Sequence, residues 1–246
     1  NRPPNPAELF SDGLHHSAAR IELGDLRFDS EISNRLSLSY SYKKSRFNLI
    51  TELFYNAVSD YMYLKPNGVL QSIRGAFPIW EYIQTDAQLF GIDLTLSYNF
   101  NDKLNLLNKT AFIKGYDGSD LPLIDLPSFT TTNSLKYTNE NWYNFSASLQ
   151  SEWVFEQNEF PDFNFETLNP TTGENVRLDI STPPPAYNIF NFYSEVKFDL
   201  GLKTSLNVDF GVNNILNTSF RNYLNRLRYF ADDLGRNITI QLQLNY

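Results

Sequence analysis

The sequence predicts an all-β protein, an antiparallel transmembrane β-barrel. Three observations predict it: apolar and polar residues alternate strictly, short turns alternate with long connections, and the composition is polar on average yet rich in aromatic residues. The chain has 246 residues, of which 41% are hydrophobic and 15% aromatic, with a mean hydropathy of −0.38. These values agree if half of each strand faces lipid and half faces water, as in outer-membrane barrels.

Nine segments show the period of two that is typical of a half-buried strand, and each is predicted to form one strand. The final segment is the clearest, because isoleucine and leucine alternate there with threonine and glutamine. One segment has mixed faces, since either Lys109 or Thr110 would have to face lipid. The predicted strands are residues 32–42, 46–60, 84–100, 103–114, 128–137, 143–155, 190–200, 204–212 and 238–246.

The connections between these segments alternate in length. Short turns are predicted at residues 43–45, 101–103, 139–141 and 201–203, and long loops near 62–83, 115–127, 157–186 and 214–235. Outer-membrane barrels have short periplasmic turns and long extracellular loops. Aromatic residues also cluster near the short turns, which predicts a girdle at the membrane interface. The short-turn end is therefore predicted to be periplasmic.

Residues 1–246 are interpreted as the C-terminal part of one barrel domain. Nine strands is an odd count, whereas bacterial single-chain barrels have an even number. An open sheet of nine strands would also leave two exposed edges. Earlier strands are therefore expected upstream of this sequence.

The composition excludes several other classes of protein. The chain has no cysteine, which excludes disulfides and thiolate metal sites. A net charge of −8 argues against nucleic-acid binding. No apolar run approaches the roughly 18 residues of a membrane-spanning helix. No Gly-x-Ser-x-Gly motif or phosphate-binding loop is present, so the chain is predicted not to be an enzyme.

Several short motifs carry a family resemblance. Residues 2–9 read Arg2-Pro-Pro-Asn-Pro-Ala-Glu-Leu, and a strand start Glu31-Ile-Ser follows. Further along are Asp60-Tyr-Met-Tyr-Leu, Ala87 followed by Gly91-x-Asp93, Phe210-Gly-Val-Asn-Asn-Ile-Leu-Asn and Gly235-Arg-Asn. In order and spacing, over nearly the whole chain, these motifs resemble TonB-dependent receptors.

The resemblance implies a barrel of 22 strands filled by an N-terminal plug, with substrate bound at the outer loops and the plug. Neither a plug nor a TonB-contact segment is visible here, so the TonB complex is expected to act through an N-terminal segment absent from this sequence. Outer-membrane lipid and lipopolysaccharide are the other expected partners. Residues 8–22 look most like the zinc- and copper-type receptors, which implies a scarce metal as cargo: zinc, copper or a ferric chelate. Ferric siderophore and haem remain open, and no resident cofactor is expected.

Two groups of residues are candidate binding sites. The adjacent His15 and His16, in a predicted outer loop, are predicted to capture Zn²⁺ or Cu²⁺ with the nearby carboxylates Asp12 and Glu22; the alternative is an exposed histidine pair. A basic and aromatic set in the 62–83 loop is predicted to clamp or stack on a chelate, and the alternative is self-packing of the loop. This second set is Arg74, Phe77, Trp80 and Tyr82.

Two further features, a set of acidic residues and the stretch 221–229, are interpreted without a binding function. Seven acidic residues are predicted to face the barrel interior, as polar wall residues contacting plug and water rather than as a cation-selective lining. The basic and aromatic stretch 221–229 is interpreted as a solvated loop in preference to a short helix or a lipopolysaccharide contact. The acidic residues are Glu52, Asp60, Asp93, Glu152, Glu195, Asp199 and Asp209.

Two other functions compete with a TonB-coupled importer. A passive outer-membrane channel requires a barrel without a plug. A secreted β-sandwich that binds glycans through exposed aromatic residues would be soluble without detergent.

Overall fold

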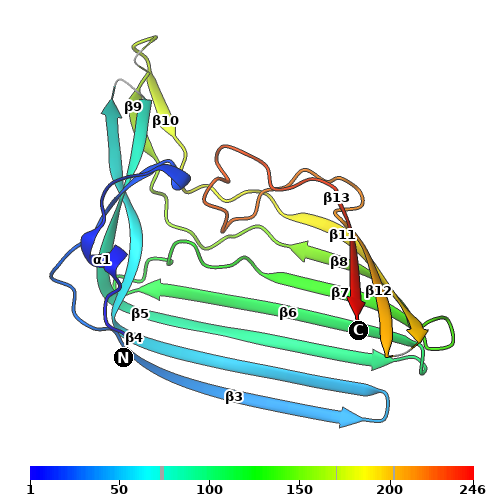
Figure 1. Ribbon diagram of the computed structural model, residues 1–246. Coiled ribbons are helices and arrows are strands. Elements are labelled where there is room, and N and C mark those ends of the chain that lie inside the picture. The colour runs from blue at the N-terminus through cyan, green and yellow to red at the C-terminus, as the bar shows by residue number, and fades with distance from the viewer. Residues whose placement is uncertain (73–74, 170, 202) are drawn as a thin grey trace.

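The computed structural model describes residues 1–72, 75–169, 171–201 and 203–246 of the chain. Nine long strands form one curved antiparallel wall, with β3 at one edge and β13 at the other (Figure 1). Along the wall the order is β3-β4-β5-β6-β7-β8-β11-β12-β13, so all nine predicted strands are confirmed. They are β3 (Ile32–Lys44), β4 (Phe47–Ser72), β5 (Gly75–Asn99), β6 (Leu104–Asp117), β7 (Thr130–Asn139), β8 (Phe145–Val154), β11 (Tyr187–Gly201), β12 (Thr204–Asn213) and β13 (Asn237–Asn245).

Short elements lie at the other end of the wall from the short turns (Figure 1). The N-terminal segment contains α1 (Pro6–Phe10), β1 (Asp12–His15), η1 (His16–Ala18) and β2 (Arg20–Leu23). Strand β2 pairs in parallel with the upper part of β5, and this is the one parallel pairing between the strands of the described chain. A separate hairpin of β9 (Phe165–Leu168) and β10 (Asn175–Leu178) rises beside the end of β4.

Among the described residues the predicted alternation of connections holds except at residues 62–83; Leu202 of the predicted turn 201–203 and Pro170 of the predicted loop 157–186 lie outside them. The described residues of 62–83 do not form a loop, because β4 and β5 continue through them as one long hairpin whose last described pair is Ser72 with Gly75. Pro66 and Gly68 lie at a shift in register, where a bulge tolerates a residue without an N–H and Gly68 takes a φ of 129°.

The register sorts side chains onto two faces. On the apolar face Leu38, Leu53 and Ile92 lie in one row across three strands, and on the polar face Glu52 lies beside Asp93. The register also assigns the faces of β6, which the sequence left open. Thr110 pairs with Leu94 and lies on the apolar face, so Lys109 lies on the polar face. No helix among the described residues is long and apolar enough to cross a membrane.

The polar face is not uniformly acidic. Glu52, Asp93, Glu152, Glu195, Asp199 and Asp209 lie on it by register, as predicted. Asp60 instead lies at the register shift between Val58 and Tyr61, with a φ of 59°. Lys136 lines the same hollow as Glu195 and Asp209, which favours the predicted polar wall over a cation-selective lining.

Aromatic pairs mark the short-turn end, as the sequence predicts. The Tyr98 and Phe100 rings lie 5.0 Å apart, and the Tyr143 and Phe198 rings 5.1 Å apart. Buried apolar residues are found instead near the long connections, where loops pack on strand ends. They include Trp80, Leu123, Ile180 and Tyr223.

Candidate functional site

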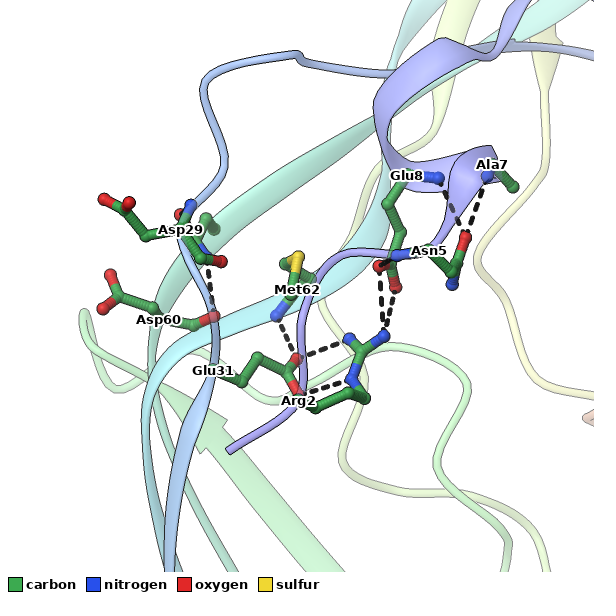
Figure 2. Close-up of polar contacts among 9 residues, drawn as sticks. Arg2, Asn5, Ala7, Glu8, Asp29, Glu31, Asp60 and Met62 are labelled. Carbon is green, nitrogen blue, oxygen red and sulfur yellow. Dashed lines mark hydrogen bonds and ion pairs between the residues drawn. The ribbon is translucent and has the colours of Figure 1, made fainter.

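A cluster of three charged residues anchors the N-terminal segment to the wall; we call it the Arg2 cluster (Arg2, Glu8 and Glu31; Figure 2). Arg2 donates from Nε and Nη2 to the two carboxylate oxygens of Glu31, at 2.7 and 2.8 Å. Its Nη1 donates to both oxygens of Glu8 at 3.0 Å. One guanidinium therefore holds two carboxylates that are 7% and 11% exposed.

Backbone groups complete the Arg2 cluster. Asn5 caps α1, and Glu8 accepts from the Asn5 amide in a capping box. Glu31 accepts from the amide of Met62 on β4 at 2.6 Å (Figure 2). Burial opposes ionisation of Glu31, but hydrogen bonds from Arg2 and from the Met62 amide lower its pKa below the ordinary value. The cluster thus positions α1, β1 and β2 above the β3–β4 end.

Replacing Arg2 with methionine is expected to release residues 1–31 from the wall. Glu8 and Glu31 would remain buried without a counter-ion, and removing one partner of a buried pair costs about 3–5 kcal/mol. Because Arg2 is itself 43% exposed, we expect roughly half of that. Limited proteolysis and amide hydrogen exchange measure how far residues 1–31 lose their protection. Arg27→Met is the matched control, because its pair with Asp25 is solvent-exposed; equal protection in both variants would contradict the anchoring role.

The predicted metal set is only partly brought together. His15 and Glu22 lie on one face of the β1–β2 hairpin, whereas Asp12 pairs with Leu23 on the other face and His16 is in η1. Glu22 is buried and accepts from Arg20 Nε at 2.8 Å. In the described part of the chain no three His, Cys, Asp or Glu residues form a group able to hold a metal. Metal capture by these four residues stays a prediction.

The second predicted set is also divided. Arg74 lies outside the described residues. Phe77 lies on the opposite face of β5 from Trp80 and Tyr82, because odd and even residues alternate along a strand. Trp80 is 3% exposed and lies at a pocket that the sequence did not predict.

This pocket, which we call the arginine–aromatic pocket, lies between β2, the upper part of β5, the end of β10 and residues 226–230. Its volume is about 150 Å³. Small and apolar residues and Asp179 complete a lining that is otherwise cationic and aromatic. The cationic and aromatic residues are Arg20, Arg226, Arg228, Trp80, Tyr229 and Phe230.

Two of the three arginines are held in place by carboxylates and rings. Arg20 stacks on Trp80 at 4.4 Å while it pairs with Glu22. Arg228, which is 4% exposed, pairs with Asp125 at 3.0 Å and stacks on Tyr229 at 4.6 Å. Arg226 forms no ion pair with any residue that the structure describes. Its charge is therefore available to a ligand.

The pocket also contains unsatisfied donors. Trp80 Nε1 and Arg228 Nε are buried and have no hydrogen-bond partner among the described residues. A buried polar group without a partner costs about 1–3 kcal/mol. An oxygen-rich anionic ligand would satisfy these donors. Burial raises the pKa of the Tyr229 hydroxyl, which stays protonated and donates to the Ile180 carbonyl.

Residues 221–229 form a loop, as interpreted, but the loop is not fully solvated. Tyr223 and Arg228 are 3% and 4% exposed, and Arg226 lines the pocket. The signal was in the sequence, because arginines interleaved with aromatic residues are typical of stacked, buried cations. The partner that buries Arg228 is Asp125, 103 residues away, and no local pattern identifies it.

Comparisons with known proteins agree with this geometry. A wall with one apolar face, short turns at one end and long connections at the other defines part of an outer-membrane β-barrel. Residues 1–215 match the family model described as TonB dependent receptor-like, beta-barrel, and the chain belongs to this family. Its members are outer-membrane receptors and transporters rather than enzymes. A search of curated protein sequences finds no match.

Solved structures show the same fold. The copper transporter OprC matches with a TM-score of 0.74 and 16% identity, over 98% of this chain and 35% of that protein. The FrpB iron transporter from Neisseria meningitidis (F3-3 variant) matches with a TM-score of 0.59 and 16% identity, over 91% of this chain and 32% of that protein. The siderophore receptor PirA from Acinetobacter baumannii matches with a TM-score of 0.58 and 16% identity, over 91% of this chain and 33% of that protein. This chain therefore spans about a third of the length of these receptors.

Proposed function

We propose that this chain is the C-terminal part of a TonB-dependent importer that takes up a scarce metal as an anionic chelate. The observation that carries the proposal is the arginine–aromatic pocket, with the unpaired charge of Arg226 and the unsatisfied donors Trp80 Nε1 and Arg228 Nε. Charge-assisted hydrogen bonds from arginine suit carboxylate and phenolate oxygens. The structural neighbours are a copper transporter, an iron transporter and a siderophore receptor, which supports a metal cargo.

The other parts of the importer are proposed from the family. A plug and a TonB-contact segment would precede this chain, and lipid and lipopolysaccharide would contact its apolar face. His15 and His16, with Asp12 and Glu22, remain a proposed capture site for Zn²⁺ or Cu²⁺. Glu22 would first have to leave Arg20, its partner at 2.8 Å. We therefore favour a ferric or copper chelate over bare zinc.

Growth of a deletion strain on chelated medium tests the proposal. Zinc, copper and ferric chelates are restored in turn, and one of them is expected to require the gene and an intact TonB system. Rescue by every metal equally would contradict metal-specific import. Uptake that persists without TonB would favour a passive channel, and recovery of the protein in the soluble fraction would favour a secreted glycan-binding protein.

A further inference from the structure

The arginine–aromatic pocket is too small for a complete metal chelate. Its volume is about 150 Å³, and a cavity of about 150 Å³ holds one benzene molecule. Pockets that enclose a whole drug-sized ligand have volumes of about 300–1,000 Å³. Only one arm of a chelate therefore fits inside, while the metal and the other arms stay outside the pocket.

The walls of the pocket suit a flat apolar group. Pro78 on β5, Leu178 on β10 and Ile180 contribute apolar surface, and the small side chains of Ala18 and Ala76 leave the space between them open. A small hydrated anion such as phosphate would gain nothing from these walls. An aromatic ring would bury both of its faces against them.

The two paired arginines differ in what they offer to such a ring. The guanidinium carbon of Arg228 lies 4.6 Å from the ring centres of both Tyr223 and Tyr229, so this group is already stacked on two rings. Arg20 lies 4.4 Å from the ring of Trp80 and stacks on no second ring among the described residues. A planar guanidinium stacks well on aromatic faces. The open face of Arg20 is therefore the place where a ligand ring would stack.

The charges at the pocket indicate which substituents the ring carries. Arg226 has no ion pair within the described chain and suits one acidic oxygen group. Asp179 also lines the pocket and accepts from the Thr182 amide at 3.0 Å. Its carboxylate would repel a second acidic group, but it accepts a hydrogen bond from a hydroxyl. One acidic group and one hydroxyl on the same ring would satisfy both side chains.

We propose that the arginine–aromatic pocket binds a single hydroxylated aromatic acid, of the hydroxybenzoate class, as one arm of a larger metal chelate. The ring stacks on Arg20, its acidic group pairs with Arg226, and its hydroxyl donates to Asp179. This assignment rests on the proposed uptake of an anionic chelate, and it narrows the substrate to chelates that carry such an arm.

Metal-free acids test the assignment on the purified full-length receptor. We expect salicylate to bind with a Kd on the order of 1 mM or tighter, as a ligand of that size allows. The control is 2-hydroxycyclohexanecarboxylate, which has the same charge and hydroxyl but no aromatic ring. It is expected to bind at least about tenfold more weakly, because it cannot stack on a guanidinium. Ligand-observed NMR measures both affinities. Equal binding of the two acids, or no binding of salicylate, would overturn the proposal.

A filled pocket shows where salicylate binds. Ala76→Leu places a larger side chain in the space that the ring would occupy, without changing any charge. We expect it to weaken salicylate binding by about tenfold or more. Ala231→Leu makes the same change on an exposed residue outside the lining and is expected to bind normally. Heat-modifiable mobility of the barrel confirms folding of each variant. A folded Ala76→Leu variant that binds salicylate as the wild type does would refute the assignment.

The metal-free probes separate this assignment from the proposed import. A receptor that binds salicylate in the pocket but imports no metal would keep the ring site and contradict the importer. A receptor that imports a chelate without an aromatic arm, and does not bind salicylate, would contradict the ring site and keep the importer.

Discussion

Gly91→Val is expected to prevent assembly of the barrel. A Cβ at Gly91 would lie 2.4 Å from the carbonyl oxygen of Phe112 and 2.7 Å from two ring atoms of Phe54. Phe54 pairs with Gly91 across β4 and β5, and its ring is held by Arg35, which stacks on it at 4.3 Å. Overpacking lowers the free energy of unfolding by about 1–3 kcal/mol, and by more where the backbone must move. We therefore expect Gly91→Val to lower the free energy of unfolding by roughly 3 kcal/mol or more.

The measurement is the fraction of receptor that reaches the outer membrane as a heat-modifiable, protease-resistant barrel. Gly118→Val is the matched control, because the nearest atom to its added Cβ is the Thr85 hydroxyl at 3.2 Å. Adding Phe54→Ala to Gly91→Val is expected to give little rescue, because the clash with the Phe112 backbone remains. If Gly91→Val gave as much folded receptor as the wild type, β6 could move away from β5 without destabilising the barrel, and the prediction would be wrong.

Arg226→Glu is expected to reduce binding of an anionic chelate by about 100-fold. The change removes a charge-assisted hydrogen bond of about 1.5–3 kcal/mol and places a like charge in the pocket. Ferric citrate and a ferric catecholate serve as probes in equilibrium binding to the purified receptor. Arg27→Glu makes the same charge change on an exposed side chain outside the pocket and is expected to bind normally. Equal losses in both variants would indicate a general electrostatic effect and not a site.

Trp80→Phe separates ligand binding from folding. The phenyl ring keeps the stacking surface under Arg20, while the unsatisfied Nε1 donor is removed. We expect thermal stability equal to or above that of the wild type, because deleting a buried unsatisfied donor relieves its desolvation cost. Chelate binding is expected to fall about tenfold. A variant that loses stability but binds normally would assign Trp80 a purely structural role.

The sequence by itself determined the strands, the two faces of all but one of them and most of the connections. These features are local, because a strand between lipid and water needs a period of two, and a turn needs only a few residues. The alternation from Ile238 to Leu244 is therefore visible without any partner. The motif from Arg2 to Glu8 and the Glu31 strand start were also visible, although the ion pairs between them were not.

Only the tertiary structure decided the register and the pocket. The assignment of Thr110 to the apolar face required its pairing with Leu94, because a shift of one residue reverses both faces of a strand. Pro66 and Gly68 had to be placed at a register shift before residues 61–72 could be recognised as strand. Trp80 and Arg228 are 148 positions apart in the chain and share one pocket. Such contacts depend on where the curved wall brings its connections together, and residue spacing along the chain carries no information about that distance.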